Sequence, residues 1–201
     1  DKSGFKLLRG VDQKKDQSYV LFTLTQKELS HLLLPVGNYP KDQIRQLASK
    51  AGLPVAEKPD SQEICFIPDG DYRKFIGKRL TPRSGQLLDT NGLVLGEHPG
   101  IQFFTIGQRK GLGLPGNTHK PMYVVKIDPE SNEVTIGPEE ALFRKTLWAS
   151  RTNYISGHAP KNILNVSAKI RYKSSQSAAT ILAREKWAEL HFEEPQRAVT
   201  P

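Results

Sequence analysis

The segment GQLLDTNGLVLGEH, residues 85–98, is the clearest folding signal in this chain of 201 residues. Short apolar runs flank the dipeptide Asn91-Gly92, which is typical of a tight hairpin turn because both turn positions need a positive φ. A second segment, MYVVKIDPESNEVTIG at 122–137, has the same layout and turns over Asp128 to Asn132. We therefore predict two β-hairpins in the middle of the chain.

The C-terminal part, from about residue 145, alternates apolar and polar side chains with the period of two that β-strands have. Val166, Ile170 and Tyr172 fall on one side of the first predicted strand, and Lys169 and Arg171 fall on the other. Repeated short strands of this kind favour small antiparallel sheets or a barrel. The three strands are predicted at NVSAKIRYK (165–173), AATILAR (178–184) and WAELHFEE (187–194).

The first 80 residues carry helix signals instead. Thr25 and Glu28 in TQKELSHLL have the spacing of a capping box. Pro40 and Gly52 bracket an apolar stripe in PKDQIRQLASKAG, as is typical of a helix start and a helix end. No complete β-α-β alternation occurs, so this part looks like the end of a larger domain. Two further short elements are predicted, a strand over QEICFI (62–67) and a helix over DYRKFIGKRL (71–80).

Composition narrows the class of protein. Lys and Arg number 29 against 21 Asp and Glu, a net charge of +8. Such an excess favours a polyanionic partner, because basic side chains that neutralise phosphates release counterions, although a soluble protein that is simply basic fits as well. No run of about 18 apolar residues occurs, so no membrane span is expected. One cysteine and no disulfide framework are typical of a reducing compartment, and we expect a cytoplasmic protein.

That cysteine, Cys65, lies in DSQEICF at 60–66. Strand alternation turns it away from Ile64 and Phe66 and toward the side of Glu63, which is less typical of an inert core thiol. Free cysteines are usually buried fillers, so a structural role stays open. Chemistry at Cys65 requires the thiolate, and therefore a nearby cation or helix N-terminus.

The glycine-rich motif TIGQRKGLG, residues 105–113, holds Arg109 and Lys110 on a turn. The glycine order does not fit a dinucleotide fingerprint, and the motif is no Walker loop. Its two cations either grip an RNA backbone or a docked domain, or they are solvated on a structural turn. The histidines lack ligand spacing, so no metal site is expected from His31, His98, His119, His158 and His191.

Two more motifs contain residue types that contact RNA. The amide of Gln17, in KDQSYVLFTL at 15–24, can both donate to and accept from a base edge. Arg171 beside Tyr172 pairs an ionic side chain with one that stacks. A buried apolar run and a solvated strand face explain these two motifs equally well.

Four motifs in this order closely resemble the tRNA-specific 2-thiouridylases: KDQSY (15–19), DSQEICF (60–66), TIGQRKGLG (105–113) and KIRY (169–172). The likeness covers essentially all 201 residues. Members of this family are bacterial enzymes, with mitochondrial relatives, that place sulfur on the wobble uridine of tRNA, position 34. The resemblance implies an α+β multidomain fold, in which 1–80 is the helical end of a Rossmann-like α/β ATP-pyrophosphatase domain. Residues 81–144 would then form a small β-rich central domain, and 145–201 a C-terminal antiparallel β-barrel.

The resemblance also implies an activity, that of a tRNA-uridine 2-sulfurtransferase. Such an enzyme adenylates the uridine C2 oxygen with ATP and magnesium and then replaces that oxygen with sulfur. Cys65 is implied to be catalytic, carrying the sulfur as a persulfide received from a cysteine desulfurase or a sulfur-relay protein. The implied substrates are tRNAs with anticodons of the lysine, glutamate and glutamine type. The residues implied to bind tRNA are Lys15, Asp16, Gln17, Arg171 and Tyr172, and Arg109 and Lys110 are candidates for its backbone or for domain docking.

The chain departs from the family pattern in two ways. The SGG-x-DS pyrophosphate loop and the partner cysteine motif are absent, so the ATP and magnesium site is expected outside this chain, which alone should not complete a turnover. The family barrel continues past TP, whereas this chain ends at Pro201, so the barrel is expected to be truncated. Two alternatives stay open, a non-catalytic RNA-binding module with a structural cysteine and, more weakly, a cysteine hydrolase with a histidine near Cys65.

Overall fold

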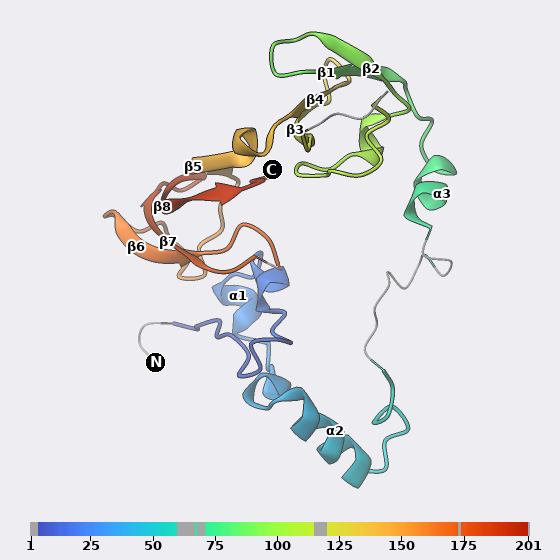
Figure 1. The fold of residues 1–201 in the computed structure, drawn as a ribbon. Coiled ribbons are helices and arrows are strands. Elements are labelled where there is room, and N and C mark those ends of the chain that lie inside the picture. Colours follow the sequence, from blue (N-terminus) through green and yellow to red (C-terminus); the bar gives the residue numbers. More distant parts are fainter. Residues whose placement is uncertain (1–3, 60–66, 68–70, 115–119, 173, 201) are drawn as a thin grey trace.

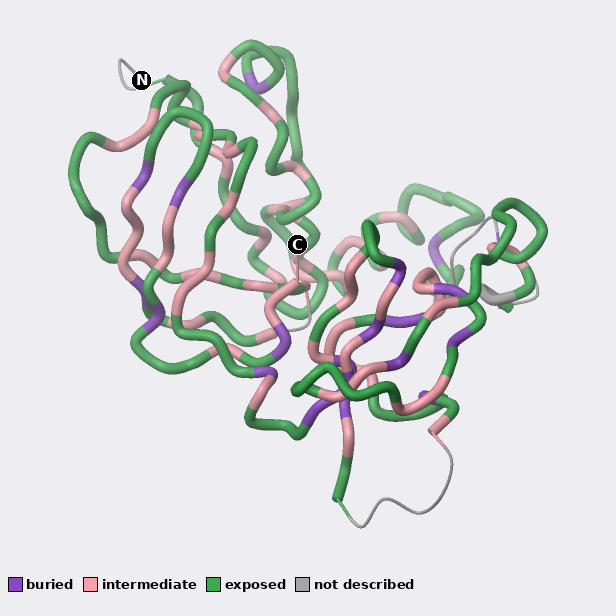
Figure 2. The backbone as a smooth tube through the Cα atoms, turned by 90° about the horizontal axis from the view of Figure 1, so that it is seen from above, coloured by how far each residue is buried: buried purple, intermediate pink, exposed green. Residues whose placement is uncertain are grey.

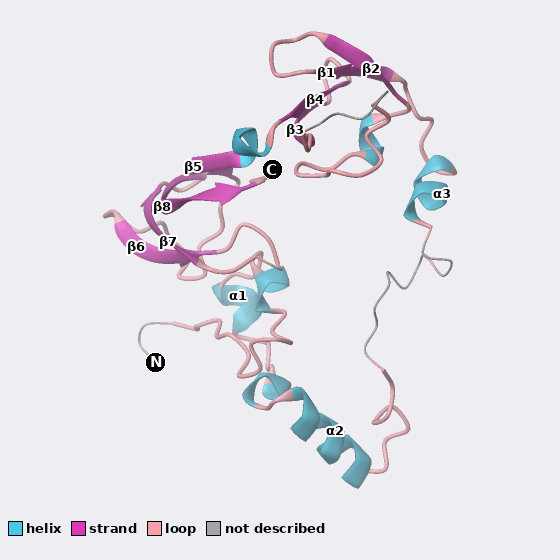
Figure 3. Cartoon of the chain, viewed as in Figure 1, coloured by secondary structure: helices cyan, strands magenta, loops and turns pink. Residues whose placement is uncertain are grey.

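The computed structural model describes residues 4–59, 67, 71–114, 120–172 and 174–200 (Figure 1). Helices occupy the N-terminal part and two β-sheets occupy the rest (Figure 3). No helix among the described residues is long and apolar enough to cross a membrane. The helices are α1 (Gln26–Leu29), α2 (Lys41–Lys50) and α3 (Tyr72–Gly77), with short 3-10 turns η1 (Ser18–Leu21), η2 (Pro35–Asn38), η3 (Ile101–Phe103) and η4 (Glu139–Leu142).

The N-terminal part has almost no core of its own. Of residues 4–59, only Leu29 and Ala56 are buried, and no strand occurs among them. The predicted capping box of α1 is confirmed, because the backbone N–H of Thr25 donates to Glu28 at 2.8 Å and the Thr25 side chain caps the helix in return. A Rossmann-like layer is therefore not visible here, and the strand predicted over 62–67 lies outside the described residues, apart from buried Ile67.

The central sheet has the strand order β2-β1-β4-β3. Its core consists of side chains fully removed from water, among them Leu87, Val124, Val134 and Ile136. β1 and β4 run parallel, which corrects the expectation of purely antiparallel sheets; the pairing joins two hairpins whose order in space is not encoded in their turns. The strands are β1 (Gly85–Leu88), β2 (Val94–His98), β3 (Tyr123–Asp128) and β4 (Glu133–Gly137).

The first hairpin forms as predicted, but its turn differs in detail. Of Asn91-Gly92, only Gly92 has a positive φ, of 85°. The Asp89 carboxylate accepts hydrogen bonds from the backbone N–H groups of Asn91 and Leu93, both at 2.8 Å, and so stabilises a wider turn. These bonds, that from Leu93 first, outweigh desolvation and hold the pKa of Asp89 below its ordinary value.

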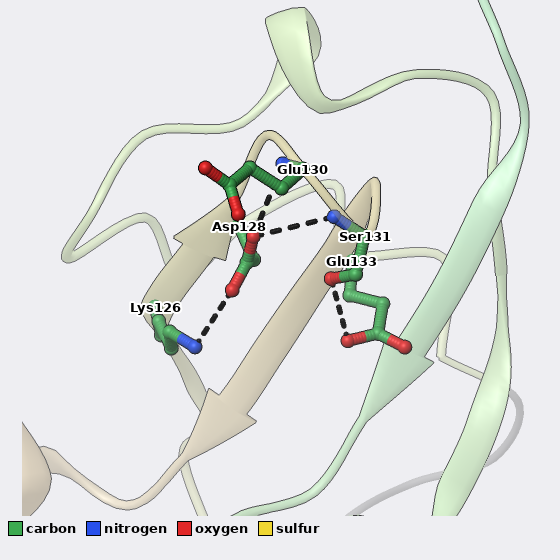
Figure 4. A network of polar contacts seen from close by, with 5 residues as sticks. All are labelled: Lys126, Asp128, Glu130, Ser131 and Glu133. Carbon is green, nitrogen blue, oxygen red and sulfur yellow. Dashed lines mark hydrogen bonds and ion pairs between the residues drawn. The ribbon is translucent and has the colours of Figure 1, made fainter.

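The second hairpin turns over Asp128 to Asn132 as predicted (Figure 4). Asp128 accepts from the Lys126 ammonium at 2.9 Å and from the backbone N–H groups of Glu130 and Ser131. The Lys126 bond, followed by the two backbone bonds, keeps the pKa of Asp128 below its usual value. Asn132 seals the turn against the first hairpin, because its buried side chain donates to the Ser84 carbonyl at 2.8 Å.

The C-terminal sheet is antiparallel with the order β5-β8-β7-β6, and its buried side chains include Ala179, Ala183, Ala188 and Phe192 (Figure 2). β5 and β6 are edge strands that do not pair with each other among the described residues, so the sheet is open rather than a closed barrel. The strands are β5 (Phe143–Ser150), β6 (Leu164–Ala168), β7 (Ser177–Ala183) and β8 (Trp187–Arg197).

The motif KIRY does not continue β6, which corrects the predicted strand over 165–173. β6 ends at Ala168, because Arg171 and Ser174 close a turn. The backbone N–H of Ser174 donates to the Arg171 carbonyl at 3.2 Å, and the Ser174 hydroxyl accepts from the Arg171 backbone N–H at 3.1 Å. Arg171 and Tyr172 therefore project from a turn and not from a strand face.

Candidate functional site

The motifs KDQSY and KIRY lie against each other, although 155 residues separate their contacting side chains. The Gln17 amide donates to the hydroxyl of Tyr172 at 2.8 Å. The ring of Tyr19 stacks on that of Tyr172, with centroids 4.9 Å apart and planes inclined by 29°. The Lys169 ammonium lies 5.5 Å from the Tyr172 ring centre, within cation–π distance. We call these four residues the tyrosine joint.

Asp16 builds the loop that presents Gln17. Its carboxylate accepts from the backbone N–H of Gly10 at 3.0 Å and from the Ser18 hydroxyl at 2.9 Å. Desolvation acts to raise the pKa of Asp16, but the hydrogen bonds from Gly10 and Ser18 outweigh it and leave that pKa below its usual value. Lys15, next to it, is exposed. Within KDQ, the side chain of Asp16 therefore faces its own loop.

Two amides that sequence reasoning missed fasten the N-terminal segment to the exit of β5. Asn153 donates to the carbonyls of Phe22 at 2.7 Å and Leu24 at 2.9 Å. Gln26 donates to the carbonyl of Ile155. Nothing in the local sequence marks Asn153 or Gln26, because their acceptors are backbone carbonyls about 130 residues away.

Arg171 joins the same turn to the glycine-rich motif. One guanidinium nitrogen, Nη2, donates to the Ile106 carbonyl at 3.1 Å and to the Ala198 carbonyl at 2.6 Å. Arg171 is otherwise exposed, so the rest of its N–H edge faces solvent. Arg171 and Tyr172 thus connect the turn after β6 to two separate predicted motifs, one on each side.

The glycine-rich motif, residues 105–113, folds back on β3. Gly107 has a φ of 88°, and a Cβ at this position would lie 2.9 Å from the Ala198 side chain, so only glycine fits. Arg109 and Lys110 are both exposed. A hollow of about 430 Å³ opens beside them, lined by Arg109, Gly111, Leu112, Gly113, Leu114, Lys120, Pro121 and Met122.

Cys65 lies outside the described residues, so its surroundings enter no part of this site. No group of three or more His, Cys, Asp or Glu side chains in the described part of the chain is arranged to hold a metal ion. That part accordingly offers no carboxylate set that fits magnesium with ATP.

A second aromatic pair was not anticipated from sequence. Trp148 on β5 and Trp187 on β8 lie with ring centres 5.3 Å apart. Trp148 is 65% exposed and Trp187 is 37% exposed. Both lie on the face of the sheet opposite buried Ala188, since alternate residues of a strand face opposite sides.

Three protein-family models match the chain in succession. The tRNA methyl transferase HUP domain matches residues 1–69, the tRNA methyl transferase PRC-barrel domain matches 73–138, and the aminomethyltransferase beta-barrel domain matches 144–201. Together they account for nearly the whole chain.

Curated relatives align over almost the full chain. The tRNA-specific 2-thiouridylase MnmA of Moorella thermoacetica is 49% identical over 205 residues, which cover 100% of this chain and 57% of that protein. The protein of the same name from Acidithiobacillus ferrooxidans is 47% identical over 203 residues, covering 99% and 57%. That of Carboxydothermus hydrogenoformans is 48% identical over 203 residues, covering 98% and 54%. The chain thus spans little more than half the length of these relatives.

Proposed function

The chain belongs to the tRNA-specific 2-thiouridylase family, and on that premise we propose that it is part of an enzyme that places sulfur on a uridine of tRNA. The observation that carries the proposal is the identity of 47–49% to proteins of that name over 98–100% of this chain. The family models carry methyltransferase names, but the relatives' names describe proteins matched along the entire chain. We propose the wobble uridine, position 34, of tRNAs with lysine-, glutamate- and glutamine-type anticodons as the substrate.

We assign the chain three parts within that enzyme. Residues 1–80 belong to a Rossmann-like ATP-pyrophosphatase domain, 81–144 form the central domain, and 145–201 form the tRNA-binding β-domain. Exposed apolar side chains along the first part, such as Leu47 at 48% and Val55 at 60%, suit a segment that packs on further structure of that domain. ATP with magnesium would activate the uridine C2 oxygen, and we place that site in the length of the relatives that this chain does not span.

Cys65 is the residue to which we assign sulfur transfer. Its thiolate attacks the terminal sulfur of a donor persulfide on a cysteine desulfurase or relay protein; a new S–S bond forms on Cys65 and the donor leaves as a thiolate. The Cys65 persulfide then attacks the activated uridine carbon, or it releases hydrosulfide while bonding to a partner cysteine. Both routes require a reducing compartment, consistent with a cytoplasmic enzyme.

The tyrosine joint and its neighbours are the proposed tRNA contacts. Gln17 keeps its amide oxygen as an acceptor for a base edge while its nitrogen donates to Tyr172. Arg171 keeps part of its guanidinium edge toward solvent for a phosphate. The remaining proposed contacts, with phosphate or with a docked domain, are Lys15, Asp16, Arg109 and Lys110.

The proposal is tested with a protein extended to the relatives' length. The portion of the Moorella thermoacetica enzyme that this chain does not span is joined to residues 1–201, and the fusion is incubated with ATP, magnesium, a cysteine desulfurase, cysteine and unmodified tRNA. Nucleoside mass spectrometry should detect 2-thiouridine with the fusion and none with its Cys65→Ser variant, while both bind tRNA equally. Equal 2-thiouridine with both proteins would remove Cys65 from the chemistry. Tight tRNA binding without any 2-thiouridine, under conditions where the Moorella enzyme is active, would instead favour a non-catalytic RNA-binding module.

A further inference from the structure

The paired tryptophans occupy one end of the C-terminal sheet. β5 and β8 are aligned so that Ser150 lies opposite Trp187 and Trp148 lies opposite Glu189. Trp148 and Trp187 are therefore diagonal neighbours on one face, with ring centres 5.3 Å apart and planes inclined by 33°. With Trp148 65% exposed, the pair presents a broad aromatic surface to solvent.

A structural role explains this surface only in part. A cross-strand pair stabilises a sheet through the area that its rings bury, and here most of Trp148 remains in water. Large aromatic side chains that stay exposed are typical of binding surfaces, where a flat partner covers them. The two tryptophans are also the only ones in the chain.

Basic residues surround the pair at the end of the sheet. The Arg184 guanidinium carbon lies 5.9 Å from the Trp187 ring centre. Lys186 and Arg151 are exposed, and the Lys186 carbonyl accepts from the backbone N–H of Thr152, which places the two basic residues on facing segments. The acidic groups nearby are Glu185 in the same turn and Glu189, which is paired with His191 at 2.9 Å.

This surface is continuous with the tyrosine joint through the exit of β5. The Tyr154 hydroxyl donates to the Arg184 carbonyl at 2.9 Å. The preceding residue, Asn153, donates to the carbonyls of Phe22 and Leu24, a few residues after KDQSY. A polyanion bound at the tyrosine joint therefore has a basic, aromatic surface beside it.

We propose that Trp148 and Trp187 form a stacking platform for unpaired bases of the bound RNA, with Arg184, Lys186 and Arg151 contacting the flanking phosphates. The inference rests on the proposed function, because it names a second contact region for the same tRNA. Every base has a π-face, so such a platform binds single-stranded RNA with little sequence preference. The cations contribute a salt-dependent share of the affinity.

Tryptophan fluorescence tests the platform directly, because both fluorophores of the chain lie in it. The 201-residue chain is titrated with unmodified tRNA at constant ionic strength, and its emission and its quenching by neutral acrylamide are recorded. N-acetyltryptophanamide with the same tRNA corrects for absorbance by the nucleic acid. Binding is measured separately by the anisotropy of end-labelled tRNA. We expect emission to fall and acrylamide access to decrease along the same curve as the anisotropy.

Matched variants separate stacking from indirect effects. Trp148→Ala should weaken tRNA binding roughly 5- to 150-fold, the range for loss of one base–aromatic stack. Trp148→Phe, which keeps a ring, should lose less. Phe143→Ala removes a 41% exposed aromatic from the far end of the same strand and should bind as the unaltered chain does. Arg184→Gln should lower the slope of log Kobs against log[salt] by about 0.7 to 0.9.

Each result decides something. tRNA binding with unchanged emission, together with Trp148→Ala binding like Phe143→Ala, would overturn the platform, leave the proposed function standing and point to a protein partner for this face. Absence of tRNA binding by the unaltered chain would overturn the platform, whereas thiolation by the extended fusion would show that the proposed function still holds. If Trp148→Ala loses its folded circular dichroism spectrum, the emission of the unaltered chain and the Trp148→Phe variant still decide.

Discussion

Replacement of Arg171 by alanine should loosen the connection between the turn after β6 and the glycine-rich motif. Arg171 Nη2 donates to two carbonyls, of Ile106 and Ala198, that belong to different parts of the chain. A hydrogen bond from a charged donor contributes about 1.5–3 kcal/mol, and because Arg171 is exposed we take about 1 kcal/mol for each. The variant should therefore lose about 2 kcal/mol, or roughly 4–8 °C in Tm for a chain of this size.

Hydrogen exchange followed by mass spectrometry locates the effect. Amides of 105–108 should exchange faster in Arg171→Ala, because the loop that supplies the Ile106 carbonyl loses its tie to the turn. Arg144→Ala is the matched control: Arg144 Nη1 also donates to two carbonyls, but to those of Ala141 and Phe143 within its own loop. Its loss should leave exchange at 105–108 unchanged. Identical exchange there in both variants would refute the connecting role of Arg171.

The same residue is a proposed tRNA contact, and lysine separates the two roles. Arg171→Ala should also lower the salt slope of tRNA binding by about one phosphate contact. Arg171→Lys keeps the charge and should restore most of that slope, but its shorter side chain with one ammonium should not restore protection at 105–108. An unchanged slope in Arg171→Ala would remove Arg171 from the tRNA contacts.

Three further predictions concern stability. Tyr172→Phe removes the acceptor for Gln17 but keeps the ring on Tyr19, so urea unfolding should show a loss of at most about 1 kcal/mol, whereas Tyr172→Ala should lose about 1 kcal/mol more; equal losses would show that the stack contributes nothing. Leu87→Ala should cost about 2–5 kcal/mol because Leu87 is fully buried, while half-exposed Leu53→Ala should cost far less in the same titration; a small, equal cost for both would place Leu87 outside the core. The lowered pKa of Asp89 means that its carboxylate stabilises the fold above its ordinary pKa of about 3.8 and that this contribution disappears as the pH falls through the lower folded-state value; the stability difference between the unaltered chain and Asp89→Asn should therefore shrink from pH 7 toward pH 3, and a constant difference would contradict the role of the charge.

Local signals in the sequence predicted local structure well. The capping box at Thr25 and Glu28 and the turn at Asp128 to Asn132 are made by residues within five positions of one another. The KIRY strand was wrong because alternation alone does not register the Arg171–Ser174 turn, in which a hydroxyl competes with a strand partner. The parallel pairing of β1 with β4 was missed because it depends on packing between hairpins and not on either turn.

The candidate site was predictable in its parts and not in its arrangement. Gln17 and Tyr172 were each identified by motif, but no spacing rule brings together side chains 155 positions apart. Trp148 and Trp187 were missed for the same reason, since the pair exists only through the alignment of β5 with β8. Asn153 binds backbone carbonyls, which any sequence provides, so its contact left no signal in the residues near Phe22 and Leu24.

The most direct test of the sulfur-transfer account is the intact mass of the protein after exposure to a sulfur donor. The fusion extended to the relatives' length and its Cys65→Ser variant are incubated with an active cysteine desulfurase and cysteine, without reductant. The account predicts a gain of one sulfur atom that is reversed by reductant and absent from the variant, because a persulfide on Cys65 is the species that carries sulfur. No gain in the fusion, with the donor shown to be active on a known acceptor, would contradict the assignment of Cys65.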